Sequence, residues 1–119
     1  MPAGFTFARG DVVMALDAAA ASTNSGSITA PQEGGPVMLG VHVTAATGTT
    51  PTLDVSLEQS ANGSSGWAAV PGSAVAQLTA AGHRVGFAVP TQPYVRVVAT
   101  IGGTTPAVTA RVAVIVFAD

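Results

Sequence analysis

Apolar and polar residues alternate with a period of two along most of the chain from residue 37 onward. Over residues 37–45, valine, leucine and alanine occupy the odd positions, while methionine, glycine, histidine and threonine occupy the even ones. The alternation recurs over residues 53–58, 85–89, 94–101 and 108–117. Successive side chains of a strand point to opposite faces of a sheet, so the pattern predicts half-buried β-strands. The core is expected to include Val95, Val97, Val112 and Val114.

Turn-forming residues separate these segments. The chain has 14 glycines and 8 prolines, spread along its length. Short strands that recur roughly every 8–15 residues between turns are typical of sandwiches and barrels. We therefore expect an all-β fold, a single antiparallel β-sandwich of about seven or eight strands, either immunoglobulin-like or jelly-roll.

The first residues follow another pattern. Residues 1–10 show no periodicity and are expected to form an extended N-terminal arm, with a first strand over residues 11–16. The chain then divides into residues 1–30, the arm and first strand, and residues 31–119, the β-sandwich domain. Phe5 and Phe7 lie on one side of an extended chain, about 7 Å apart. Two outcomes are open for them, insertion into a neighbouring subunit or packing on their own sandwich.

One tetrapeptide occurs twice. Residues 48–51 and 103–106 both read Gly-Thr-Thr-Pro, and strand-like segments flank each copy. Glycine supplies a positive φ and proline lacks an N–H for the ladder, so each copy is predicted to be a hairpin tip. Convergent turn chemistry is the favoured explanation of the repeat. The alternative is that both tips meet at one end of the sandwich and form a paired contact surface of Thr49, Thr50, Thr104 and Thr105.

Charge is scarce and changes the list of possible functions. Charged residues make up 8% of the chain, lysine is absent, and the net charge is −2. Such a chain cannot hold a nucleic-acid backbone by releasing counterions, so no nucleic-acid partner is expected. There is no cysteine, which removes disulfides and thiolate metal sites. The longest apolar run, residues 112–118, is far shorter than a bilayer span, and the start lacks a secretion signal, so no membrane partner is expected.

The candidate chemistry is equally sparse. His42 and His83 have no evident catalytic partner in the sequence, and no Gly-x-Ser-x-Gly nucleophile elbow occurs. Asp54 and Glu58 share a strand face about 13 Å apart, which is too far for a glycosidase pair. We expect no enzyme, no cofactor and no metal site.

Four larger side chains could serve binding. Trp67 and Tyr94 could stack on a sugar, although structural positions in or beside the sandwich are favoured for both. Arg96 and Arg111 lie on strand faces opposite the core. They are candidate polar anchors for an acidic partner, and a solvated face is the alternative for each.

A series of short motifs follows in order along the last two-thirds of the chain: residues 46–55 (ATGTTPTLDV), Gln59-Ser60, Asn62-Gly63, Trp67, Ala81-Gly82, residues 93–97 (PYVRV) and residues 102–106 (GGTTP). In this order they resemble the small β-sandwich minor capsid and decoration proteins of tailed bacteriophages. Residues 1–30 carry none of these motifs.

The resemblance implies a structural protein of the virion, made in the host cytoplasm and bound to the outer surface of the capsid. Its expected partners are the major capsid protein and further copies of itself, with a trimer expected at the junctions between capsomers. Two alternatives remain open. The chain could be a tail, neck or head-fibre module with the same fold, or a carbohydrate-binding domain.

Overall fold

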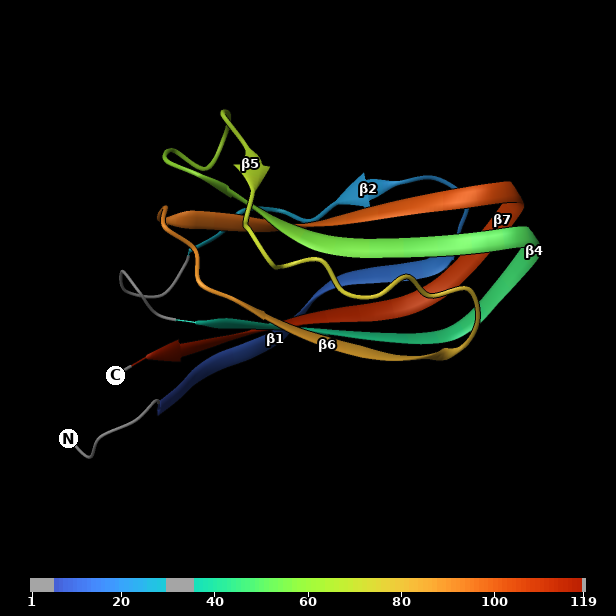
Figure 1. The fold of residues 1–119 in the computed structure, drawn as a ribbon, viewed down its shortest axis with the longest axis horizontal. Coiled ribbons are helices and arrows are strands. Elements are labelled where there is room, and N and C mark those ends of the chain that lie inside the picture. The colour runs from blue at the N-terminus through green and yellow to red at the C-terminus, as the bar shows by residue number, and fades with distance from the viewer. Residues whose placement is uncertain (1–5, 30–35, 119) are drawn as a thin grey trace.

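A computed structural model describes the backbone of residues 6–29 and 36–118 (Figure 1), and within those ranges it contains strands and turns but no helix. The all-β prediction is confirmed, since the strands form one seven-stranded antiparallel sheet that stays open. The strands are β1 (Thr6–Ala19), β2 (Thr23–Asn24), β3 (Ile28–Thr29), β4 (Val37–Ser60), β5 (Ala68–Ala69), β6 (Gly82–Ala88) and β7 (Tyr94–Ala118).

Two long strands organise the molecule. β4 has 24 residues and β7 has 25, and they pair with each other from Val37 opposite Val116 to Ser60 opposite Tyr94. Both strands bend together at one end of the molecule, so that the paired ribbon folds back over itself (Figure 1). The bend coincides with shifts of register between Thr47 and Thr52. We call this bend the corner.

The corner divides the sheet into two layers. In the first layer the order is β1, the C-terminal half of β7, the N-terminal half of β4, and β6. In the second layer β2 and β3 pair with the N-terminal half of β7, which pairs with the C-terminal half of β4. Beyond β4 lie β5 and an irregular segment whose Leu78 bridges to Leu53.

The inner faces of the two layers bury one apolar cluster. Leu39, Val41 and Val43 contribute from the first layer, and Leu53 and Leu57 contribute from the second. Burying each such side chain stabilises the fold by about 1.5–3 kcal/mol. The predicted core valines are confirmed as buried, with relative exposures of 0–3% for Val95, Val97, Val112 and Val114.

The prediction of an N-terminal arm is wrong for residues 6–10. β1 begins at Thr6, five residues earlier than expected, and Phe7 pairs with Phe117 of β7. The C-terminal half of β7 offers backbone donors and acceptors along this stretch, and pairing satisfies them without any need for side-chain periodicity. Phe5 lies outside the described residues. β1, β2 and β3 all pair with β7, so the described part of residues 1–30 belongs to the same sheet as the rest.

The two predicted hairpin tips are also wrong. The Gly-Thr-Thr-Pro segments lie inside β4 and β7, and Thr49 pairs with Thr104 across the ribbon. Neither segment reverses the chain onto its own flanking strand. The same turn chemistry here bends two strands together, because each segment finds its ladder partner in the other.

Candidate interaction surfaces

The corner brings the four predicted threonines together. Thr49, Thr50, Thr104 and Thr105 are all exposed, and the two segments have nearly the same geometry. The Thr50 hydroxyl donates to the carbonyl of Thr49 at 2.8 Å, and the Thr105 hydroxyl donates to the carbonyl of Thr104 at 2.8 Å. The two segments therefore lie together at one end of the molecule, as the alternative interpretation of the repeat expected. That their threonines contact a partner stays a prediction.

The corner depends on its glycines. Gly48 and Gly103 both have φ of 109°, in the region that side chains rarely adopt. A Cβ on Gly48 would lie 2.5 Å from the carbonyl oxygen of Thr105, and one on Gly103 would lie 2.6 Å from that of Thr50. Each glycine thus makes room for the backbone of the other segment. The corner is a close backbone-to-backbone contact that no other residue type fits.

Arg96 is occupied within the chain. Its Nη2 lies 2.7 Å from Glu58 Oε1, and its Nε donates to the same oxygen at 2.9 Å. The guanidinium carbon lies 4.5 Å from the centre of the Trp67 ring, which is cation–π distance. These contacts join β7, β4 and the residue just before β5. Arg96 and Glu58 are 24% and 27% exposed, so the group is half-buried and its charge is balanced.

Arg111 also has partners in its own chain, although it is more exposed. Its Nη2 lies 3.1 Å from Asp17 Oδ1, and its Nη1 donates to the carbonyls of Leu16 and Ala110. Nearly half of its side chain remains accessible. Arg111 therefore links β1 to β7 and still has an accessible guanidinium. Arg96, by contrast, is mostly covered and is engaged by Glu58 and Trp67. The proposed role of Arg96 and Arg111 as anchors for an acidic partner stays a prediction.

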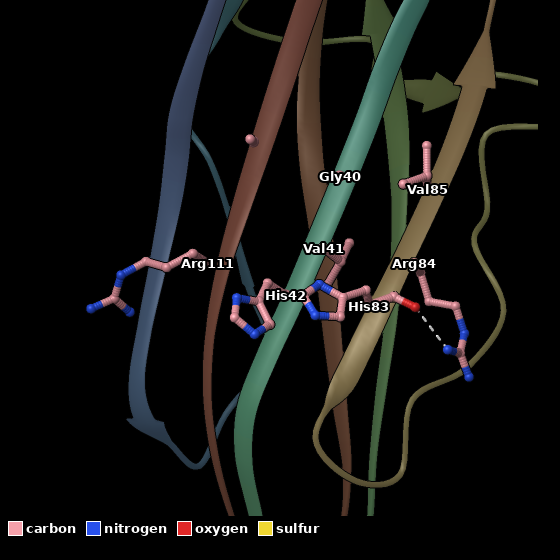
Figure 2. A pocket seen from close by; sticks show the side chains of 8 residues that line it. Gly40, Val41, His42, His83, Arg84, Val85 and Arg111 are labelled. Carbon is pink, nitrogen blue, oxygen red and sulfur yellow. Dashed lines mark hydrogen bonds between the residues drawn. The ribbon is translucent and has the colours of Figure 1, made fainter.

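The two histidines, far apart in sequence, stack on each other. His42 of β4 pairs with His83 of β6, and their rings are 4.1 Å apart at an interplanar angle of 14°. They border a shallow hollow of about 230 Å³ over Gly40, which has no side chain to fill it (Figure 2). Val85 and Ala113 also line the hollow, while the guanidinium groups of Arg84 and Arg111 point away from it on opposite sides. The floor of the hollow is therefore apolar.

An apolar stripe on β6 is the surface that sequence reasoning missed. Val85 and Phe87 of β6, and Val89 just after its end, are 62%, 61% and 50% exposed, and Val85 and Phe87 lie on the outer face of the first layer. Their alternation is typical of a strand with a buried apolar face, yet the inward positions hold Gly82, Arg84, Gly86 and only one apolar side chain, Ala88. A signal was present in those two glycines, because alternate glycines on the other face leave room for a neighbouring segment.

The buried polar groups have partners in the part of the chain that the structure describes. The Ser73 hydroxyl, for example, bonds to both the N–H and the C=O of Leu57 and so fixes the second layer to the segment after β5. Among the same residues, no three His, Asp or Glu side chains gather to hold a metal ion. No helix in the described ranges could span a membrane.

Comparisons with known proteins found no relative of this chain. No family model matches it, and no curated protein has a significant sequence match to it.

Proposed function

We propose that this chain is a structural protein of a tailed-phage virion, which binds the outer surface of the capsid as a homo-oligomer and reinforces the junctions between capsomers. The major capsid protein would be its partner and the host cytoplasm its place of assembly. The proposal rests on the order of sequence motifs that resembles minor capsid and decoration proteins. The observation that carries it furthest is the order of the strands.

We further propose that the fold is a jelly roll, and that the immunoglobulin-like form is the lesser alternative. Cutting β4 and β7 at the corner, and counting β2 with β3 as one strand, gives eight segments. Numbered along the chain, the first layer has the order 1-8-3-6 and the second has 2-7-4-5. A folded double-stranded ribbon with this order is a jelly roll, a fold that viral capsid proteins use. The support that a jelly-roll fold lends to a role in the virion is an analogy, and the fold does not by itself establish the function.

The chemistry of the surface favours a partner that is another protein. The chain has only four arginines and six acids, and within the described residues Arg96 and Arg111 are paired with acids of the same chain. Protein contacts over such a surface desolvate few charges. A lattice makes many copies of a modest contact available at once, so a firm attachment does not require a large single interface.

The alternatives are separated by particular residues. A carbohydrate-binding domain would offer two or more open aromatic rings in a groove; Phe87 is exposed, but Arg96 lies over the ring of Trp67, and Trp67 is half-buried. A tail, neck or head-fibre module has the same expected fold and remains the second candidate, since the corner threonines at one end of the molecule suit attachment by an end.

Binding to particles that lack this chain tests the proposal. We expect the purified protein to bind assembled capsids, to bind free capsid subunits much less, and to lose less than about tenfold in affinity between 50 and 500 mM salt, because few charges are available to be screened. Binding confined to tails or necks would support the second candidate. Absence of binding to any part of the particle would contradict both.

A further inference from the structure

The outer face of the first layer is apolar across three adjacent strands. Beside Val85 and Phe87 of β6 lie Gly40 and Met38 of β4, and beside those lie Ala113 and Ile115 of β7. Met38, Gly40, Ala113 and Ile115 are only partly covered. None of these residues is charged. Large exposed side chains that gather in one patch usually mark a surface that another molecule covers.

This patch ends at a strand edge that has no partner in the described part of the chain. β6 pairs with β4 along one side only. Arg84 Nη1 donates to the carbonyl of His83 at 2.8 Å, near the start of the strand. No proline, lysine or acid occurs over residues 82–89, so Arg84, near the start of the strand, is the one charged residue there that could discourage another strand from pairing. The middle of β6, residues 85–87, therefore joins an open backbone edge to an apolar face.

We propose that β6 pairs with β6 of a second copy of this chain, antiparallel about a two-fold axis through Gly86, and so joins two sheets into one. A second copy is the occupant that the register favours. In this register Val85 of each copy lies opposite Phe87 of the other copy, so this pair forms twice. Arg84 of each copy lies opposite Ala88 of the other. Pairs of an aromatic and a β-branched residue across strands are favourable, and no like charges face each other. An axis through Val85 would instead set Phe87 against His83 and replace the two Val85–Phe87 pairs by a single Val85–Val85 pair.

The inner face of β6 is covered by its own chain, so a second copy would meet only the edge and the outer face of this strand. Gly86, on the axis, has no side chain, and a Cβ there would lie 3.0 Å from Val75. Seven residues of strand extend about 23 Å, so the contact is small and the dimer is expected to be weak. The pairing does not depend on attachment to a capsid, and it predicts a dimer where the resemblance implies a trimer.

Sedimentation of the purified chain between about 1 and 300 μM tests the pairing. We expect a reversible monomer–dimer equilibrium in the wild type, a monomer throughout for Phe87→Lys, and wild-type behaviour for the control Thr100→Lys. Thr100 is an exposed strand residue of the second layer, so the control adds the same charge elsewhere. Thermal unfolding at the lowest concentration checks that both variants fold. A wild type that stays monomeric at 300 μM, one that forms only trimers, or a Phe87→Lys variant that still dimerises would overturn the proposal.

Cysteine cross-linking tests the register, since the native chain has no cysteine. The double variant Val85→Cys, Phe87→Cys should form a disulfide-linked dimer on mild oxidation, because opposite positions of an antiparallel pair lie within disulfide reach. The control Thr100→Cys should remain largely monomeric. Equal cross-linking of the two would place the contact elsewhere and overturn the two-fold pairing through β6.

Discussion

Two threonines hold the most unusual backbone in the corner. Thr50 and Thr105 have φ of 48° and 47°, a left-handed conformation that is uncommon for a β-branched residue. Such a residue costs about 1–3 kcal/mol and persists when its surroundings fix it. Here the facing glycines and the ladder on both sides fix it. The strain is a structural reason for the repeated tetrapeptide, beside any contact that the threonines make with a partner.

Replacing a corner glycine should therefore be costly. Gly48→Ala adds a Cβ against the Thr105 carbonyl and keeps the residue in a disfavoured φ, so we expect the free energy of unfolding to fall by at least ~2 kcal/mol. Gly26→Ala is the control, because a Cβ there would meet nothing within 4 Å, and it should change stability by less than ~0.5 kcal/mol. Denaturant unfolding of both variants gives the comparison. Equal stabilities would contradict the close backbone contact at the corner.

A pair of valines tests which side of each strand is buried. Val112 is fully buried, and Val112→Ala should destabilise the fold by about 2 kcal/mol through lost burial and the cavity left behind. Val85 is 62% exposed, and Val85→Ala should change stability by less than ~0.5 kcal/mol at concentrations where the chain is monomeric. Thermal melts of the two variants should separate clearly. A large loss for Val85→Ala would place β6 the other way round.

At the scale of the strands, period-two alternation predicted the strands of β4, β6 and β7 and the burial of Val95, Val97, Val112 and Val114. It did not predict which face of β6 is buried, because alternation separates the two faces of a strand without showing which of them turns toward the core. Val75 lies so close to Gly86 that a large side chain could not point inward there. Nor could local turn chemistry distinguish a hairpin from a shared corner. That distinction depends on which strand pairs across the ladder, and the pairing joins residues more than fifty positions apart, as with Thr49 and Thr104.

The ion pair of Arg96 and the start of β1 were hidden for a similar reason. Glu58 and Trp67 reach Arg96 only because β4, β5 and β7 are neighbours in the second layer. Residues 6–10 have no periodic side chains, and their pairing with β7 depends on backbone groups that every residue type carries.

The first strand limits how the arm can be tested. Removing residues 1–10 would delete the start of β1 and several of its pairs with β7, so we expect a lower melting temperature. Removing residues 1–5 spares β1. If Phe5 inserts into a neighbouring subunit, the shorter deletion should weaken binding to particles while the melting temperature of the isolated chain stays within about 2 °C, because no described pair is lost. Phe5→Ala in the full chain should weaken binding in the same direction, and unchanged binding in both variants would show that the arm is not needed.

At the scale of the whole molecule, the fold suits a part that covers and joins others. One folded ribbon supplies both layers, the core is continuous through them, and the described polar groups in it have partners. The features left over are surfaces: the exposed corner at one end, the accessible guanidinium of Arg111, and the apolar stripe on β6. A two-fold contact through β6 would leave the corners of both copies free for the proposed contact with a capsid.

Reinforcement of the capsid is the central claim, and the temperature at which particles release their genome tests it most directly. Particles assembled with this protein should release DNA at a higher temperature than particles without it, because a protein that binds the closed shell stabilises that state by mass action. Adding the purified chain back to deficient particles should restore the higher temperature. Release at the same temperature in all three samples would contradict the account.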